Sequence, residues 1–172
     1  MRRDAVAIPG GVGGRRYRDG VTDASLAAGY RMLLEPPTVE EYRRLRAVSG
    51  LSPKTAGQAE GAIAGTWTWR TVRLDRGADA AGEDSPGEAV AMGRVIGDGG
   101  WYFLVADMAT LPEHQGRGLG KAVLRSLLAE IRERAEPGAY VTLTADPPGR
   151  RLYEAHGFED VAPARTGMSL LT

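Results

Sequence analysis

The 172-residue chain contains no cysteine, only two histidines and no excess of either charge. Without cysteine it can form neither disulfides nor thiolate metal sites, and it has no cysteine nucleophile. Two histidines leave little for an imidazole metal site or a Ser-His-Asp triad, so we expect no metal cofactor. The 22 basic and 22 acidic residues balance, so no overall field attracts polyanions, and we expect no nucleic-acid partner.

Long hydrophobic runs are also absent. The longest apolar run of interest covers only residues 101–106, whereas about 20 apolar residues are needed to cross a bilayer. Near the N-terminus, Pro9 and several glycines interrupt the apolar stretch that a signal peptide would need. We therefore expect a cytoplasmic protein that makes no membrane contact.

The remaining composition is that of one globular domain, with 42% hydrophobic and 26% charged residues. Residues 1–30 are rich in Gly, Arg and Asp without a sustained period, which predicts a flexible N-terminal arm. An arm that folds on a partner or on a neighbouring subunit is the alternative. We expect residues 31–172 to form the domain, as a monomer or a homodimer.

Hydrophobic periodicity and turn residues predict the order of the elements. A capping box of Thr38 and Glu41 predicts a helix that Gly50 ends, and Ser52 with Pro53 predicts a second helix over 54–63. Two further helices are expected over 118–135 and 149–156. Strands are expected over 32–34, 66–74, 88–96, 101–110 and 140–144, with a last strand from Gly157 into the tail. This order predicts an α+β or mixed α/β sheet.

One glycine-rich segment lies between the strand over 101–110 and the strongest predicted helix. It reads Gln115, Gly116, Arg117, Gly118, Leu119, Gly120, Lys121. Glycines let the backbone approach a ligand closely, and a helix N-terminus adds partial positive charge, which predicts a phosphate or pyrophosphate site. Arg117 and Lys121 would be additional cations. The segment matches neither a Walker loop nor a dinucleotide fingerprint. The alternative interpretation is that the glycines only form a tight turn between a strand and a helix.

Two motifs in this order resemble those of the GNAT acetyltransferase family. The first is Gln115-x-x-Gly118-x-Gly120, with Pro112 ahead of it. The second is Leu152-Tyr153-Glu154-Ala155-His156-Gly157-Phe158. The resemblance covers roughly residues 32–170. It implies a single domain with a central, mostly antiparallel sheet flanked by helices and splayed between its fourth and fifth strands.

The resemblance also implies site residues for acetyl-CoA as cosubstrate. The expected cofactor-binding residues are Met108, Ala109, Thr110, Gln115, Gly116, Arg117, Gly118, Leu119, Gly120, Lys121 and Asp146. Asp146 stands where family members often have Asn, which puts its contact in doubt. Tyr153 would be the general acid for the departing sulfur, or else a packed aromatic beside Phe158. Asp107 is the candidate general base, with an ion pair inside the sheet as the alternative.

The expected reaction is direct acetyl transfer to a primary amine, because no cysteine is available for a thioester intermediate. A weaker resemblance to the serotonin-type arylalkylamine N-acetyltransferases rests on Ala91-Met92-Gly93-Arg94, Asp98, Ala145-Asp146 and Gly167-Met168. It implies a small acceptor, aromatic or a polyamine whose second ammonium Asp98 would bind. Arg94 and Asp98 shaping a hairpin is the alternative. A non-catalytic acyl-CoA sensor and a peptide or protein N-acetyltransferase are the other functional hypotheses.

Overall fold

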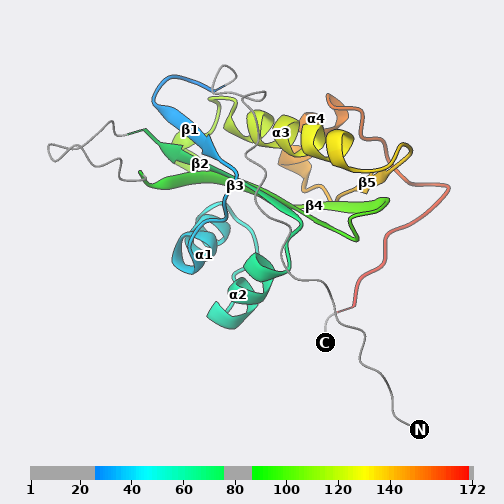
Figure 1. Cartoon of the computed structure of the whole chain (residues 1–172), viewed down its shortest axis with the longest axis horizontal. Coiled ribbons are helices and arrows are strands. Elements are labelled where there is room, and N and C mark those ends of the chain that lie inside the picture. Colours follow the sequence, from blue (N-terminus) through cyan, green and yellow to red (C-terminus); the bar gives the residue numbers. More distant parts are fainter. Residues whose placement is uncertain (1–25, 76–86, 171–172) are drawn as a thin grey trace, which may run out of the picture.

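The computed structural model describes residues 26–75 and 87–170, and these form one five-stranded sheet with helices on both faces (Figure 1). The strands, in sheet order, are β1 (Tyr30–Leu33), β2 (Thr68–Leu74), β3 (Ala89–Gly97), β4 (Tyr102–Thr110) and β5 (Tyr140–Thr142). Neighbouring strands are antiparallel, except that β4 and β5 are parallel. The mixed α/β fold expected from the sequence is confirmed.

Helices α1 and α2 cover one face of the sheet, and α3 lies on the other with α4 beside it (Figure 1). Their bounds are α1 (Val39–Val48), α2 (Ala56–Ala64), α3 (Leu119–Arg134) and α4 (Arg150–Glu154). Two short 3-10 helices, η2 (Pro112–His114) and η3 (Pro147–Gly149), precede α3 and α4. The helices therefore cover both faces of the sheet.

Both α1 and α2 begin with a capping box, in which two orphan N–H groups are satisfied reciprocally. In α1, Thr38 Oγ1 accepts from the Glu41 N–H, and the Glu41 carboxylate accepts from the Thr38 N–H, as the sequence predicts. In α2, Thr55 and Gln58 make the same pair of bonds. The helix predicted over 54–63 therefore starts two residues too early.

The core lies mainly between the sheet and α3, where the apolar face of the helix is buried. Its buried hydrophobic members are Leu119, Ala122, Val123, Leu124, Leu127, Leu128 and Ile131. Gly93 of β3 lets the helix approach closely. A Cβ there would come within 2.5 Å of Met108 Sδ and 2.6 Å of Val123 Cγ1. A larger residue at this position would force β3 and α3 apart and displace the Met108 side chain.

The chain after α4 departs from the sequence prediction. Residues 158–170 contain no strand, so the expected last strand is wrong for the described part of the tail. Residues 159–170 are all exposed, and Met168 is 96% accessible. A short edge strand explains the difference, because the three residues of β5 offer few backbone groups for an added strand to pair with.

The predicted flexible arm falls mostly outside the described residues. Of residues 1–30, the structure describes 26–30, and Tyr30 is the first residue of β1. The flexibility of residues 1–25 thus stays a prediction, as does the domain boundary at residue 31.

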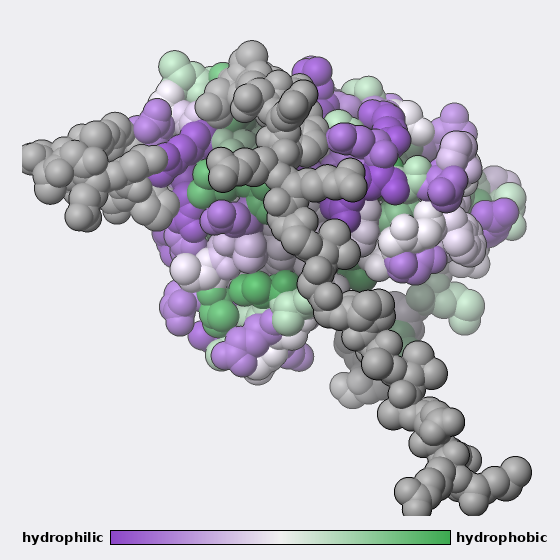
Figure 2. Space-filling view, in the orientation of Figure 1, coloured by the Kyte–Doolittle hydropathy of each residue, from purple (hydrophilic) through white to green (hydrophobic). Residues whose placement is uncertain are grey.

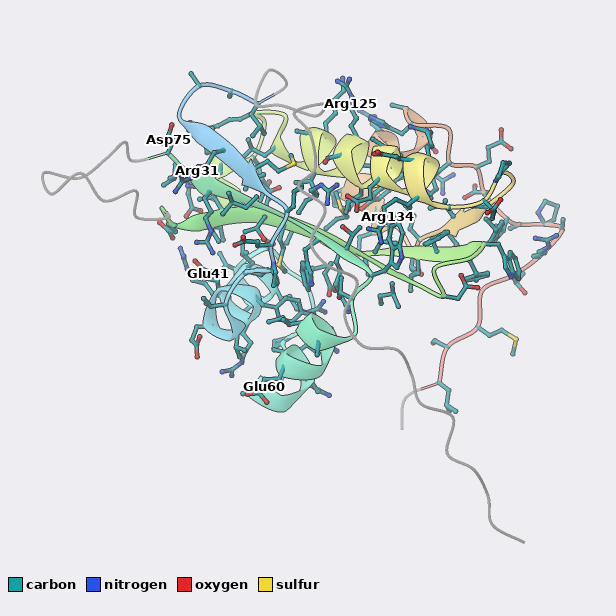
Figure 3. The ribbon with its side chains drawn as sticks, viewed as in Figure 1. Arg31, Glu41, Glu60, Asp75, Arg125 and Arg134 are labelled. Atoms are coloured by element: carbon teal, nitrogen blue, oxygen red, sulfur yellow. The ribbon has the colours of Figure 1, made fainter. Side chains whose placement is uncertain are left out.

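Polar side chains cover the outer surface of α3, while a smaller hydrophobic area lies over α1 and α2 (Figure 2). Glu60 on α2 and Arg125 on α3 point away from the sheet on opposite sides of the molecule (Figure 3). In the part of the chain that is described, no helix is both long and apolar enough to span a bilayer.

Candidate acyl-CoA cleft

A cleft of about 640 Å³ opens where β4 ends and α3 begins. Its walls come from residues 49–51, which follow α1, from the second half of β4 (105–110), from the glycine segment, and from η3 with α4. The cleft exists because β4 and β5 pair only at Tyr102–Leu104 with Tyr140–Thr142, after which they diverge. This divergence is the splay expected from the sequence, and it leaves residues 105–110 without a ladder partner on that side.

A β-bulge shapes the wall that β4 contributes. In the β3–β4 ladder Met92 pairs with Ala109 and Arg94 with Ala106, so that Asp107 and Met108 together oppose Gly93. Asp107 has a φ of 53°, which places a non-glycine residue in the left-handed region. Such backbone strain persists only where the surroundings fix it, and it is concentrated at functional sites. The bulge turns the Asp107 side chain toward α1, where its ion pairs lie.

The glycine segment forms a left-handed turn into α3. Gly116 and Gly118 have φ values of 74° and 77°, conformations that side chains with a Cβ rarely adopt. Gly118 is the N-cap of α3 and offers no side-chain hydrogen bond, so the first N–H groups of the helix stay available. Free N–H groups at the positive end of a helix favour an anion. The local geometry is therefore that of a phosphate site.

The residues of this segment divide into two groups. Gln115, Gly116 and Gly120 line the cleft. Arg117, Gly118, Leu119 and Lys121 do not. Leu119 packs into the core, so only its backbone could contact a ligand, while Arg117 and Lys121 are exposed cations of the segment.

The end of β4 is held by side chains that the sequence analysis did not connect with it. The Thr110 carbonyl accepts from Ser49 Oγ and from Gln115 Nε2, each over 3.1 Å. Gln115 thus fixes the loop to the strand, and the Thr110 carbonyl is already hydrogen-bonded. Met108 and Ala109 also line the cleft, and their backbone groups lie along the same wall.

Tyr153 faces the cleft from α4 and packs against Gly149. A Cβ on Gly149 would be 3.2 Å from the Tyr153 ring and 3.7 Å from its hydroxyl. Burial raises the pKa of the Tyr153 hydroxyl, and the negative charge of Asp146 raises it further. The ring also makes an edge contact with Phe158, with centroids 6.0 Å apart. Tyr153 is accordingly both a packed aromatic and a protonated hydroxyl at the cleft wall.

Asp146, the second carboxylate of the cleft, precedes η3 and is exposed. Its side chain makes no capping hydrogen bond, and its carbonyl accepts from the Gly149 N–H over 2.9 Å. The loop is therefore closed by backbone, and the carboxylate acts on Tyr153 through its charge.

Asp107 forms the ion pair that the sequence left as an alternative to base catalysis. Its two oxygens contact Arg46 and Arg94, the latter through Nε at 2.5 Å, and the Tyr42 hydroxyl donates to Oδ2 over 2.7 Å. A base needs a free lone pair that can take a proton, whereas both carboxylate oxygens of Asp107 are already engaged by guanidinium and hydroxyl donors. The geometry favours an anchoring role for Asp107.

The comparisons with known proteins agree with this architecture. A family model described as an acetyltransferase (GNAT) domain matches residues 79–160. A solved structure described as a probable acetyltransferase from meticillin-resistant Staphylococcus aureus is 31% identical and has a TM-score of 0.73. The similarity covers 83% of this chain and 99% of that one. The chain belongs to the GNAT acetyltransferase family.

Other relatives extend this assignment less far. A GNAT-family protein from Streptococcus pneumoniae, 22% identical with a TM-score of 0.62, shares the fold over 83% of this chain and 96% of its own. Serotonin N-acetyltransferase 2 of Oryza sativa subsp. japonica is 35% identical over 85 residues. That match covers 49% of this chain and 42% of the rice protein, so less than half of the relative's length is matched.

The GNAT motifs identified the cleft, but the sequence analysis missed the residues that surround Asp107. Arg46 lies one helical turn after Tyr42 on the buried face of α1, and this position was the available signal, because a charged residue there needs a partner. Arg94 was expected to belong to either the β3–β4 hairpin or the acceptor site. The structure places it against Asp107, away from the hairpin turn.

Asp98 does shape the hairpin. Its Oδ1 accepts from the N–H groups of Gly100, Trp101 and Tyr102, and these bonds lower the pKa of its carboxyl. A carboxylate engaged by three backbone donors at the tip of a turn is poorly placed to bind a second ammonium in the cleft.

Proposed function

We propose that this protein is an acetyl-CoA-dependent N-acetyltransferase that transfers the acetyl group directly to a primary amine of a small molecule. One observation carries the proposal: the cleft between the diverging strands β4 and β5 joins an uncapped helix N-terminus to Tyr153. Acetyl-CoA supplies the activated acetyl thioester. The absence of cysteine from all 172 residues supports direct transfer.

The cleft has the features that acetyl-CoA requires. The N–H groups at the start of α3 suit a pyrophosphate, which needs several donors and partial positive charge. The unpaired side of β4 beyond Leu104 offers backbone groups to an extended, amide-containing arm. Gly120 lines this path without a side chain. Met108, Ala109 and Thr110 would bind the arm, and residues 115–121 the phosphates.

Two residues receive distinct roles near the reacting atoms. Tyr153 would donate its proton to the departing sulfur, and its raised pKa keeps it protonated at neutral pH. Asp107 would be a positioning residue, which fixes the bulge by binding Arg46 and Arg94. The amine would then lose its proton to water in the cleft.

Incubation of the protein with acetyl-CoA and a panel of small amines tests this function. Free thiol release and the acetylated product, detected by mass spectrometry, should appear together with at least one amine. Bound acetyl-CoA without acetyl transfer above spontaneous hydrolysis would instead support the sensor. A peptide library run in parallel would reveal acetylation of peptides or proteins. Cytoplasmic location and a monomeric or homodimeric state stay predictions.

A further inference from the structure

Five side chains meet at the β4 bulge on the face of the sheet that α1 and α2 cover. We call Tyr42, Arg46, Trp69, Arg94 and Asp107 the bulge cluster. Its centre is the Asp107 carboxylate, which accepts from the first two and from Arg94. Trp69 lies directly opposite Arg94 in the β2–β3 ladder. Of these five residues Asp107 lines the cleft, and it therefore links the cluster to the proposed transfer site.

The bulge cluster has one more positive than negative group, because it contains two guanidinium groups and one carboxylate. The Arg46, Arg94 and Asp107 side chains are only 8%, 12% and 9% exposed. Burial and the hydrogen bond to Asp107 raise the pKa of Tyr42, so its hydroxyl is neutral. Glu41, the neighbouring carboxylate on α1, is already paired with Arg73. A largely buried excess charge is costly unless an opposite charge binds beside it.

The hydrogen-bond donors that still lack an acceptor indicate where that opposite charge would bind. Arg46 is committed, because it donates to Asp107, to the Ser52 carbonyl and to Ser52 Oγ. Arg94 uses Nε for Asp107 and Nη1 for Ala62 O and Thr66 Oγ1. Within the described parts of the chain, no acceptor is recorded for its Nη2.

Trp69 supplies a second, independent observation. The residue is 4% exposed, and its indole Nε1 is buried without a hydrogen-bond partner among the described residues. The Arg94 guanidinium carbon lies 5.7 Å from the Trp69 ring centroid. Unpaired buried donors are rare in folded proteins and call for an explanation, such as a bound group.

We propose that the acceptor carries a carboxylate in addition to its amine, and that Arg94, assisted by the Trp69 indole N–H, binds this carboxylate. The inference rests on the proposed function and names its substrate class. One excess charge matches a monoanion, whereas a phosphate carries about −1.5 to −2 at neutral pH. A planar carboxylate also suits a guanidinium edge. Diamines, which add positive charge to the cluster, are poor acceptors.

Matched pairs of acceptors isolate the carboxylate from the rest of the molecule. Phenylalanine is compared with phenethylamine, and 4-aminobutyrate with butylamine, each with saturating acetyl-CoA. In at least one pair the carboxylate should raise kcat/KM by about 10- to 100-fold, the effect of a charged hydrogen bond. The difference should reside mainly in KM. A faster reaction of the plain amine in every pair would overturn the proposal.

Two variants test the residues, with a matched control. Arg94→Gln should abolish the preference for the carboxylate, while acetyl-CoA still raises the melting temperature. Trp69→Phe retains a six-membered aromatic ring and removes the N–H together with the five-membered ring, so it should raise KM for the carboxylate-bearing acceptor several-fold. Trp101→Phe makes the same change at a residue that is 60% exposed and should alter nothing. An unchanged preference in Trp69→Phe and in folded Arg94→Gln would contradict the assignment.

If acetyl-CoA binds but no member of either series is acetylated, the proposed function fails and binding decides the inference. Calorimetric titration of the same pairs into CoA-saturated protein then measures the preference directly. Tighter binding of the acids, lost in Trp69→Phe, would support a carboxylate site in a non-catalytic protein. Equal or weaker binding of the acids would overturn it.

Discussion

The two sides of β4 are built by different means. On the cleft side, the groups that suit a cofactor are backbone groups, exposed by Gly116, Gly118 and the uncapped start of α3. On the face that α1 and α2 cover, the bulge cluster is built from charged and aromatic side chains that come from α1, β2, β3 and β4, and Asp107 joins it to the cleft. A site built from backbone groups suits a ligand that all members of a family bind. A site built from side chains can differ from one member to the next and so select a particular ligand. We therefore expect the cofactor to be general and the acceptor particular.

Removal of the Asp107 carboxylate should give the largest effect, because it leaves two guanidinium groups without their counter-charge. Asp107→Ala is expected to lower stability by about 3 to 5 kcal/mol, which corresponds to a fall in melting temperature of roughly 6 to 20 °C for a chain of this size. Thermal unfolding followed by circular dichroism measures the change.

Kinetics of a second variant, Asp107→Asn, distinguish the two roles of Asp107. If it positions the bulge, any folded Asp107→Asn protein should lose activity without losing the ascending limb of its pH profile. A variant of unchanged stability whose activity returns only at high pH would restore Asp107 as the general base.

Tyr153→Phe should lower kcat by about 10- to 100-fold, because it removes the proton donor. Acetyl-CoA affinity should change little, since the ring and its contact with Phe158 remain. Burial and the nearby Asp146 charge raise the pKa of Tyr153, so the loss of activity through its ionisation should occur at higher pH than for an ordinary tyrosine. Asp146→Asn removes a negative charge, lowers that pKa, and should move the loss to lower pH. Rapid-mixing assays across this range would show it, and full kcat in Tyr153→Phe would remove the assignment.

Gly120→Ala separates cofactor affinity from stability. A Cβ at Gly120 would lie 3.7 Å from Thr110 Oγ1 and 3.9 Å from Leu152 Cδ2, which is ordinary contact. The free protein should therefore be as stable or gain up to about 1 kcal/mol, while the methyl group in the cleft weakens acetyl-CoA binding about tenfold, or about 1.4 kcal/mol.

Gly57→Ala in α2 is the matched control, because nothing lies within 4 Å of its Cβ. It should show a similar gain in stability with unchanged affinity. Calorimetry measures both variants, and equal affinities for acetyl-CoA would contradict the placement of the cofactor beside Gly120.

Asp98→Ala should give the smallest effect. Its backbone bonds hold the pKa of Asp98 below the unfolded value, so its contribution to stability is present above about pH 4 and is lost as the pH falls through the folded pKa. At neutral pH the variant should be slightly less stable, and at acidic pH the difference should vanish. The KM for any diamine should stay the same, whereas a large increase would return Asp98 to the acceptor site.

The contrast across β4 also explains what could be predicted from the sequence. Glycines at positions 116 and 118 indicate a turn with positive φ values, and Thr38 with Glu41 predicts a helix start from four consecutive residues. The place of Tyr153, in contrast, comes from the resemblance of the second motif to the GNAT family. Local rules and this resemblance together predict the cleft.

The bulge cluster could not be predicted in this way, because its contacts join residues far apart in the sequence. Tyr42 and Asp107 are separated by 65 positions, and Arg94 reaches Asp107 only because β3 and β4 pair with a bulge. The last predicted strand failed for a related reason. A strand needs a partner edge, and residues 158–170 carry no information about the length of β5.

Acetyl-CoA binding in the cleft is the central claim, and ligand-dependent thermal unfolding tests it most directly. At 100 times Kd, acetyl-CoA should add about 2.7 kcal/mol and raise the melting temperature by roughly 5 to 10 °C. CoA should act similarly and ATP should not. An unchanged melting temperature with both CoA species, in a cooperatively folded sample, would reduce the glycine segment to a turn and contradict the account.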